Sequence, residues 1–405
     1  MIIELIIALS LGIIIGIITG LFPGIHINLV AAFLLASSVF LLNIFQPISL
    51  AVFIVSLSIT HIFTDFIPTI FLGAPDSDTT LSILPGHEML IKGEGYEAVI
   101  LSIIGALIGV IILLPFIPIF IYILPIIYPY VQRIIPIILI TIIFMMILSE
   151  KGKNKFLTIL IIFLSGCLGY FSLNLNIKEA LLPLLTGLFG SSSLITSILK
   201  KQEIPIQNIT KIKAIIKNLK KDSIIKSISA SVIASPICSF LPSLGSSQAS
   251  IIGSIVIGEL DRKEFIILNG IVNTLVMSLS FIILYSIKKS RTGSSVAINT
   301  LLPSLTKNDL EIIILAVIVS AIFAFLISIM IVKNFSKLIT KINYTKLSIL
   351  ILSLLTIVTL IFSGIIGLII LITSTALGVL CILSRIKRTS LMGCLLIPTI
   401  ILYLL

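Results

Sequence analysis

The chain has 405 residues, of which 58% are hydrophobic and 11% are charged, and its formal net charge is +11. This composition is far from that of a soluble globular domain. The basic residues are scattered in short connections between apolar runs and form no continuous solvated basic face, which argues against a nucleic-acid partner. The partner that this composition indicates is the lipid bilayer.

Apolar runs of about 20 residues recur along the chain, which is the length that crosses a hydrocarbon core of about 30 Å as a helix. In lipid a segment must satisfy its own backbone polar groups, and strand-like alternation is absent from the sequence. The sequence therefore predicts an all-α polytopic integral membrane protein with about 10–12 transmembrane helices. The first run, Ile2 to Phe22, has no basic leader, so we interpret it as a retained span and not as a signal peptide.

A break follows the first run at Pro23 and Gly24, because proline cannot donate a helical hydrogen bond and glycine permits a turn. The next apolar run, Ile27 to Phe45, begins at once, with His26 and Asn28 at its start. Two runs joined without a polar connection are compatible with a re-entrant hairpin or with two spans and a tight turn. We favour the hairpin.

The run from Ile48 to Leu72 carries polar residues, among them His61, Thr64 and Asp65. His61 and Asp65 are four residues apart, so their side chains can meet on one face of a helix. Pro68 is expected to break this helix and to free the carbonyl group of Thr64. We predict a cation or proton site formed by these three residues; the alternative is a polar patch that only locks helix packing.

A turn at Gly73-Ala74-Pro75 leads into Asp76-Ser77-Asp78-Thr79-Thr80. One of these residues can serve as the N-cap of a following short helix, but capping does not explain two aspartates and two threonines beside a span. We therefore expect them to bind the solute. The alternative is a membrane-embedded enzyme in which Asp76 and Asp78 bind a metal on a lipid-linked phosphate, with His61 as the base.

Further spans are expected at Ala98 to Pro125, Ile134 to Ser149, Phe156 to Leu175 and Ala180 to Leu199. The prolines at 115, 118, 125, 129 and 136 predict kinked or broken helices in the first two of these. In the second half, spans are expected at Ile312 to Val332, at Leu347 to Leu383, which we divide into two around Gly364 and Gly367, and at Leu391 to Leu405. The positive-inside rule places the short basic connections in the cytoplasm, and two spans separate the first two of them, as this orientation requires. These connections are Lys151–Lys155, Lys200–Lys226, Lys333–Lys346 and Arg385–Arg388. The four cysteines occur singly without ligand spacing, which indicates core residues.

The second half of the chain repeats features of the first. Pro242 follows Pro23 by 219 residues and Gly293 follows Gly73 by 220, which predicts an internal repeat. We expect two inverted membrane repeats, residues 1–199 and 227–405, joined by a lysine-rich loop at 200–226. Gly245 and Ser246 follow the second break, and Asn269 and Asn273 lie four residues apart in the next span. Paired broken helices are typical of secondary-transporter binding sites.

Several motifs resemble those of the TctA family, the large permease subunit of tripartite tricarboxylate transporters, including its shorter archaeal-type members. They are Gly20-x-x-Pro23-Gly24, Gly73-Ala74-Pro75 with the Asp/Ser/Thr run, Leu84-x-Gly86-x-x-Met89-x-x-x-Gly93-x-x-x-Glu97-Ala98 and Leu241-Pro242-x-x-Gly245. The resemblance implies uptake of a small solute driven by an ion gradient, a small membrane subunit and an extracytoplasmic solute-binding protein.

We therefore expect a multi-pass permease of the cytoplasmic membrane, not an enzyme, that moves an organic carboxylate or another small anion with H⁺ or Na⁺. No cofactor and no metal are expected. The coupling ion is assigned to His61, Thr64 and Asp65. The residues expected to bind the solute are Pro23, Gly24, His26, Asn28, Gly73, Asp76, Ser77, Thr79, Pro242, Gly245, Ser246 and Asn273.

Overall fold

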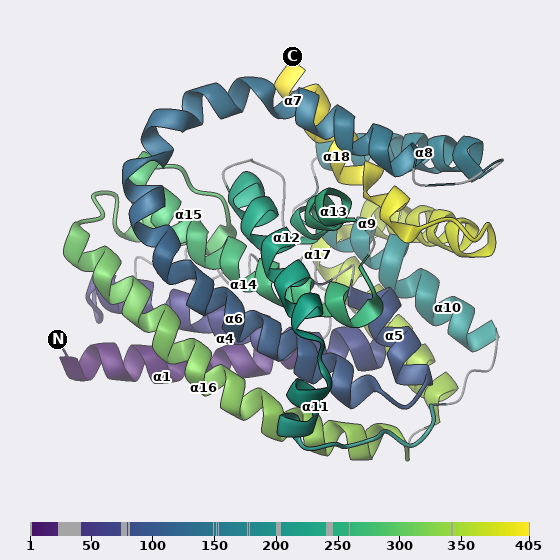
Figure 1. Ribbon diagram of the computed structural model, residues 1–405, viewed down its shortest axis with the longest axis horizontal. Coiled ribbons are helices and arrows are strands. Elements are labelled where there is room, and N and C mark those ends of the chain that lie inside the picture. Colours follow the sequence, from purple (N-terminus) through teal and green to yellow (C-terminus); the bar gives the residue numbers. More distant parts are fainter. Residues whose placement is uncertain are drawn as a thin grey trace.

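The protein is an assembly of helices, shown as a computed structural model in Figure 1. Its described part contains no strand, which confirms the all-α prediction. The structure describes residues 2–22, 42–73, 79, 82–148, 150, 152, 154–175, 177, 179–199, 204–239, 246–258, 260–341 and 343–404.

Eight helical segments in these residues are long and apolar enough to cross a membrane. They are α1 (Ile2–Leu21), α4 (Pro47–Leu72), α6 (Gly95–Tyr122), α8 (Asn154–Asn174), the segment Leu181–Leu199, α14 (Arg262–Ile287), α16 (Lys307–Ile339) and α17 (Tyr344–Leu383). Helix α7 (Leu124–Leu148) adds a ninth if its two limbs, bent by 68°, form one span. The sequence predicted about 10–12, and most of one predicted run, Ile27 to Phe45, lies outside the described residues.

Shorter helices complete the described chain: α5 (Ile83–Ile91), α9 (Leu181–Leu185), the π-helix η2 (Thr186–Ser191), α10 (Ser192–Leu199), α11 (Ile212–Asn218), α12 (Lys221–Ser239), α13 (Ser246–Ile257), α15 (Gly293–Leu301), η3 (Arg388–Met392) and α18 (Gly393–Leu404). Helix α18 has only 12 residues, about 18 Å at 1.5 Å per residue. The predicted last span, Leu391 to Leu405, falls in an apolar helical segment, Arg388–Leu404, that is shorter than the eight candidate spans. Helix α18 packs on α8, where the Cβ of an alanine at Gly393 would lie 2.6 Å from the carbonyl oxygen of Ile162.

Helix α4 continues through Pro68 and ends at Leu72, so the predicted break at Pro68 is wrong. A proline in a helix loses one hydrogen bond, but here packing on all sides holds the helix together, since its residues from Ile48 to Leu72 are buried except Phe53. The helix ends at Gly73, whose φ of 62° is left-handed and whose N–H bonds to the carbonyl of Pro68. Glycine adopts this conformation without the steric cost that a Cβ brings.

Other predicted breaks take different forms. Helix α6 contains Pro115 and Pro118 and continues to Tyr122, whereas α7 bends between Leu124–Tyr130 and Arg133–Leu148. Helix α17 has a non-helical residue at Gly364, with φ 66° and ψ −163°, where the sequence predicted a division between two spans. The segment Leu181–Leu199 is interrupted by the π-helix η2, a distortion found often at functional sites.

Helices α1 and α4 run parallel in very close contact. An alanine Cβ at Gly12, Gly16 or Gly20 of α1 would lie 2.6 to 2.7 Å from the carbonyl oxygens of Phe53, Leu57 and His61, in that order along α4. The backbone N–H of Gln46 donates to Glu4 Oε1 at 2.7 Å, so α4 begins beside the start of α1. Phe22 and Gln46 therefore lie at opposite ends of this helix pair.

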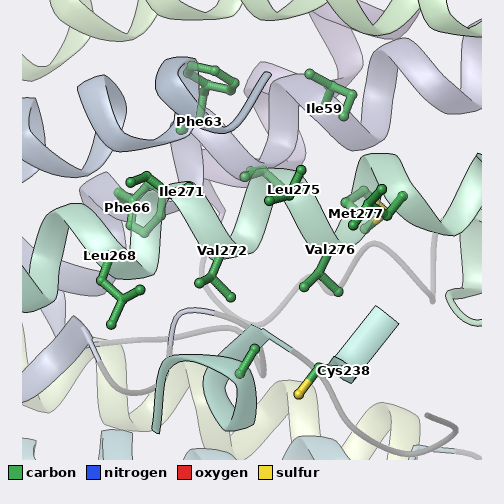
Figure 2. Close-up of a cluster of buried hydrophobic side chains, with 14 of the residues drawn as sticks. Ile59, Phe63, Phe66, Cys238, Leu268, Ile271, Val272, Leu275, Val276 and Met277 are labelled. Carbon is green, nitrogen blue, oxygen red and sulfur yellow. The ribbon is translucent and has the colours of Figure 1, made fainter. Parts of the chain in front are cut away.

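The second half has a similar pair. Helix α12 runs parallel to α14, because Ser227 of α12 bonds to the carbonyl of Glu264 near the start of α14 and Cys238 lies on the side of Val276 (Figure 2). Helix α13 turns back along α12, where the Cβ of an alanine at Gly253 would be 2.9 Å from the carbonyl oxygen of Ala230. A helical hairpin thus occupies the predicted second break, whose tip, residues 240–245, lies outside the described residues.

The two halves cross over one another. Helix α6 of the first half packs along α14 of the second, and α16 packs along α4. Helices α6 and α14 are parallel, since Glu97 meets Lys263 and Gly109 meets Ile271 further along. Figure 1 shows α16 beside α6 in the opposite direction and in the same direction as α1. The buried helices α4 and α14, 26 residues each, therefore run in opposite directions.

The core lies between α4 and α14. In Figure 2 Ile271 and Leu275 lie on the side of α14 toward Ile59, Phe63 and Phe66 of α4, whereas Leu268 lies on the opposite side with Val272 and Val276. All of these residues belong to one buried hydrophobic cluster. Lipid tails are as apolar as these side chains, so the attraction between the helices comes mainly from close van der Waals packing and interhelical hydrogen bonds. This explains why glycines, and not larger residues, occupy the helix contacts.

The basic connections meet at one end of the molecule. The backbone N–H of Asn208 donates to the carbonyl of Gly93 at 2.8 Å, and that of Lys387 donates to Glu150 Oε1 at 3.1 Å. At this end the rings of His87 and Tyr344 have centroids 5.8 Å apart. The starts of α1 and α16 lie at the opposite end.

Candidate functional site

A buried carboxylate in α4 forms the centre of the candidate site. Asp65 is 6% exposed. Its Oδ2 accepts a hydrogen bond of 2.6 Å from the hydroxyl of Thr79, and its Oδ1 is 3.5 Å from the hydroxyl of Thr69. These two hydroxyls are 2.9 Å apart. The structure thus places Asp65, predicted to bind the ion, in direct contact with Thr79, predicted to bind the solute.

The other two residues of the predicted ion site contact α1. His61 Nδ1 lies 3.1 Å from Thr19 Oγ1. The hydroxyl of Thr64 lies within hydrogen-bonding distance of the carbonyl oxygens of Thr60 and His61 in its own helix and of Gly16 in α1. These are contacts of helix packing, and they hold α1 on the face of α4 that carries the histidine.

Two residues assigned to the solute come together in the second half. The hydroxyl of Ser246 on α13 donates to Asn273 Oδ1 on α14 at 3.0 Å. One turn away, the hydroxyl of Ser250 donates to Asn269 Oδ1 at 2.6 Å. Two Ser–Asn pairs thus lie side by side between antiparallel helices.

The two groups of polar residues are connected. The amide nitrogen of Asn269 donates to the hydroxyl of Ser82, and the backbone N–H of Ser82 donates to the carbonyl of Thr79 at 2.8 Å. Ser82, Asn269 and Ser250 are fully buried. A chain of buried polar contacts, which we call the polar network, therefore runs from Asp65 through Thr79, Ser82 and Asn269 to Ser250.

The network includes residues that the assignment from sequence missed. Thr69, Ser82, Ser250 and Asn269 were not assigned a role, although they carry a recognisable signal. Ser246 and Ser250 are four residues apart, as are Asn269 and Asn273, so each pair lies on one helix face. Spacing indicates a shared face, but it does not say which faces meet.

The remaining predicted residues divide into two groups. Gly73 ends α4 with a left-handed backbone conformation. A Cβ added at Gly73 would lie 3.6 Å from the side chain of Leu194. The others lie outside the described residues: Pro23, Gly24, His26, Asn28, Asp76, Ser77, Pro242 and Gly245.

Metal-ligating side chains are dispersed in the part of the chain that the structure describes. No group of three or more His, Cys, Asp or Glu residues there could hold a metal ion. Cys238, Cys381 and Cys394 are buried, Cys167 is partly exposed, and all four are free thiols. The groups that contact Asp65 in the polar network are the neutral hydroxyls of Thr79 and Thr69.

Comparison with known proteins identifies the family. The model of the tripartite tricarboxylate transporter TctA family matches residues 6–393. The chain belongs to the TctA family. It is also 33% identical over 396 residues to the uncharacterized protein MJ1079 of Methanocaldococcus jannaschii, a match that covers 94% of each chain. No solved structure matches it.

Membership of the TctA family confirms the resemblance of the motifs and covers essentially the whole chain. The protein is a permease component of the tripartite tricarboxylate transporter type and not an enzyme, so the alternative of a metal-dependent enzyme acting through Asp76 and Asp78 is set aside. With its apolar spans, this TctA-family protein is a multi-pass protein of the cell membrane.

Proposed function

We propose that this TctA-family protein is a secondary transporter that moves a small organic carboxylate, or another small anion, across the cytoplasmic membrane together with H⁺ or Na⁺. The observation that carries the proposal is the position of Asp65. Other acidic residues in the described spans lie near helix starts, whereas Asp65 lies deep in α4. Ionisable groups inside a membrane are costly and usually belong to a transport pathway.

The environment of Asp65 supports its assignment to the coupling ion. An ionised carboxylate in an apolar interior is unfavourable unless hydrogen bonds or a cation compensate it. The hydroxyls of Thr79 and Thr69 provide part of this compensation. We propose that H⁺ or Na⁺ binds at this carboxylate, so that Asp65 takes up the ion when the site opens to one side and releases it on the other.

The arrangement of the helices supports an inverted repeat. The series α1, α4, α5, α6 corresponds to α12, α14, α15, α16, and the members α4 and α14 have 26 residues each while α5 and α15 have nine each. The two series run in opposite directions (Figure 1). Transporters built in this way bind their solute where the repeats meet, which in this chain is the polar network between α4 and α14.

The chemistry of the network suits an anion. Hydroxyl and amide groups of Ser246, Ser250, Asn269 and Asn273 can donate hydrogen bonds to a carboxylate without adding a charge. We assign the solute to these four residues and Thr79, with Asp76 and Ser77 as further candidates. In a tripartite system a small membrane subunit and an extracytoplasmic solute-binding protein complete the transporter, and the end where α1 and α16 begin is the proposed docking end for the binding protein.

Uptake into proteoliposomes tests this function. Labelled carboxylates and other small anions are offered to the permease with its partner subunits, under a Na⁺ gradient, a pH gradient or neither. We expect saturable accumulation that requires one gradient. Asp65→Asn should abolish accumulation while the protein remains folded in the membrane, whereas Asp222→Asn, the same change at an exposed position of α12, should have no effect. Accumulation by Asp65→Asn with unaltered ion dependence would contradict the assignment.

A further inference from the structure

The connection between α14 and α15 carries three basic residues, Lys288, Lys289 and Arg291. Helix α14 begins beside the start of α6, at the end of the molecule that carries the other basic connections. Since α14 is a continuous helix of 26 residues, it ends on the other side of the molecule, where α1 and α16 begin (Figure 1). Short basic connections normally lie on the cytoplasmic side, so a basic connection at the opposite end requires a separate explanation.

Two of these residues, Lys289 and Arg291, share one hydroxyl group, and we call them the cation pair. The Nζ of Lys289 donates to the hydroxyl oxygen of Tyr128 in α7 at 3.1 Å, and Nη2 of Arg291 donates to the same oxygen at 3.2 Å. The ammonium group also lies over the ring of Tyr128, 4.8 Å from its centroid. Two like charges held on one oxygen atom repel each other, and a hydroxyl group offers them no negative charge.

Carboxylates do not balance the cation pair in the described part of the chain. Neither Lys289 nor Arg291 forms an ion pair with a described residue. The carboxylates at the starts of α1 and α16 have other partners: Glu4 has Gln46, Asp309 has Thr306 and Glu311 has Lys307.

The guanidinium of Arg291 also has a donor to spare. Its Nε is buried and makes no hydrogen bond with a described residue, although Tyr403 of α18 lies nearby. The side chain is only partly exposed, whereas that of Lys289 is exposed. The cation pair therefore combines one held charge and one accessible charge, with capacity left to bind an anion.

The connection has a counterpart in the first half of the chain. Counted from the start of each helix, Ser280 of α14 stands where Asp65 stands in α4. Both helices end at a residue with a left-handed backbone, Gly73 with φ 62° and Lys288 with φ 53°. The connection from α14 to α15 thus corresponds to the segment that carries Thr79 in the proposed inverted repeat.

The equivalent contacts differ in charge. In the first half the hydroxyl of Thr79 donates to the carboxylate of Asp65. In the second half the hydroxyls of Ser280 and Thr292 are 3.1 Å apart, and Arg291 directly precedes Thr292. A carboxylate suits a cation, whereas two hydroxyls beside an arginine suit an anion.

The same connection leads toward the polar network. Ser294, in the first turn of α15, is buried, and its hydroxyl lies 2.7 Å from the hydroxyl of Ser58 in α4. Helix α4 carries Asp65, and α14 carries Asn269 and Asn273. The cation pair therefore lies at one end of the two helices between which the solute is proposed to bind.

We infer that the cation pair is an outer binding site that holds a carboxylate group of the solute before the solute reaches the polar network. An ammonium and a guanidinium held close together can both donate to one carboxylate, and such charge-assisted hydrogen bonds are stronger than those to a neutral hydroxyl. The hydroxyl of Tyr128 keeps the two groups together. The inference rests on the proposed function, since it takes the transported solute to be an anion.

Equilibrium binding without a gradient tests the inference. The purified full-length protein in neutral detergent is dialysed against labelled citrate or succinate at constant ionic strength, and the dissociation constant is measured. We expect Lys289→Gln to raise the dissociation constant about fivefold and Arg291→Gln to raise it about tenfold, because each removes one charge from the site. Arg291→Lys keeps the charge and should retain more of the affinity than Arg291→Gln.

Controls separate this site from general surface charge and from lipid. Lys307→Gln removes an exposed lysine at the same end of the molecule and should change nothing. Trimethyl citrate, which is uncharged, should not compete with labelled citrate. Dioleoyl phosphatidylglycerol offers a lipid phosphate in place of a carboxylate and should not displace citrate. Because Lys289 is exposed, Lys289→Gln decides the question even if Arg291→Gln does not fold.

Three results would overturn the inference: no binding of citrate or succinate, equal binding by Lys289→Gln and the wild type, or displacement of citrate by phosphatidylglycerol. The last result would make the cation pair a lipid site. Failure of the proposed function gives a different result, namely Lys289-dependent binding without gradient-driven accumulation of any anion. Accumulation of an anion with a half-saturating concentration that Lys289→Gln leaves unchanged would support the function and refute the outer site.

Discussion

The hydroxyl of Thr79 donates a 2.6 Å hydrogen bond to the carboxylate of Asp65, although the two residues are 14 apart in the chain and α4 ends between them. Thr79 therefore lies against the one carboxylate deep in that helix. The carbonyl of Thr79 also accepts a hydrogen bond from the N–H of Ser82, and the hydroxyl of Ser82 accepts one from Asn269. A displacement of Thr79 would therefore change the hydrogen bonds of both Asp65 and Ser82.

Thr79→Val should weaken ion binding while preserving the shape of the side chain. A hydrogen bond to a charged group contributes about 1.5–3 kcal/mol, so the half-saturating ion concentration for uptake should rise about 10- to 100-fold. Thr79→Ser keeps the hydroxyl and should stay near the wild type. The control is Thr158→Val in α8, where a buried hydroxyl has no hydrogen-bond partner among the described residues. An unchanged ion dependence of Thr79→Val would show that this hydroxyl does not take part in coupling.

Asn269→Ala should reduce both stability and solute affinity, because it leaves the hydroxyls of Ser82 and Ser250 buried without their amide partner. The expected loss in unfolding free energy is about 1–3 kcal/mol. A double-mutant cycle with Ser250→Ala measures the coupling energy of the pair directly. We expect a coupling energy of about 0.6 to 1.7 kcal/mol, which is the range for hydrogen bonds between helices in membrane proteins. Additive effects of the two substitutions would mean that the pair is not formed.

Gly16→Leu should separate α1 from α4. An alanine Cβ at Gly16 would already lie 2.7 Å from the carbonyl oxygen of Leu57, so a larger side chain forces the helices apart at a cost of about 1–3 kcal/mol or more. The unfolding midpoint in detergent should fall accordingly. Ile14→Leu, on the exposed face of α1, is the matched control and should leave the midpoint unchanged. Equal midpoints for the two variants would argue against the packing described for this pair.

Single introduced cysteines test the orientation. On a background without the native cysteines, Lys213→Cys and Lys341→Cys should react with an impermeant maleimide only in inside-out vesicles, because the basic connections are expected in the cytoplasm. Asn308→Cys, at the exposed start of α16, should react in intact cells. Labelling of Lys213→Cys from outside would reverse the proposed orientation and, with it, the docking end for the solute-binding protein.

The sequence predicts the spans well because the thickness of the bilayer fixes the length of an apolar run. It also predicts the turn at Gly73 and the division of α17 near Gly364, since glycine is specific for these backbone conformations. The sequence wrongly predicts that α4 breaks at Pro68, because the packing that keeps this helix intact comes from helices elsewhere in the chain.

The contacts of the site are the part that sequence could not predict. Asp65 was recognisable from its apolar surroundings, but its partner Thr79 was assigned to another ligand. The pairing of Ser82 with Asn269 joins residues far apart in sequence and depends on how the two halves cross. In contrast, the Gly12, Gly16 and Gly20 spacing is a signal in the sequence itself, since small residues at intervals of four mark close helix contacts in membranes.

The crossing of the halves has a consequence for biosynthesis. Helix α4 is synthesised early, but α15 and α16, which pack against it, are made only after more than half of the chain. For example, the hydroxyls of Ser58 and Ser294 are 2.7 Å apart although 236 residues separate them in the chain. Until these helices are made, the face of α4 that carries Ser58 lacks its final partners. A chain that stops before α16 therefore lacks the helices that cover α4, and we expect it not to reach the packed structure of the full-length permease.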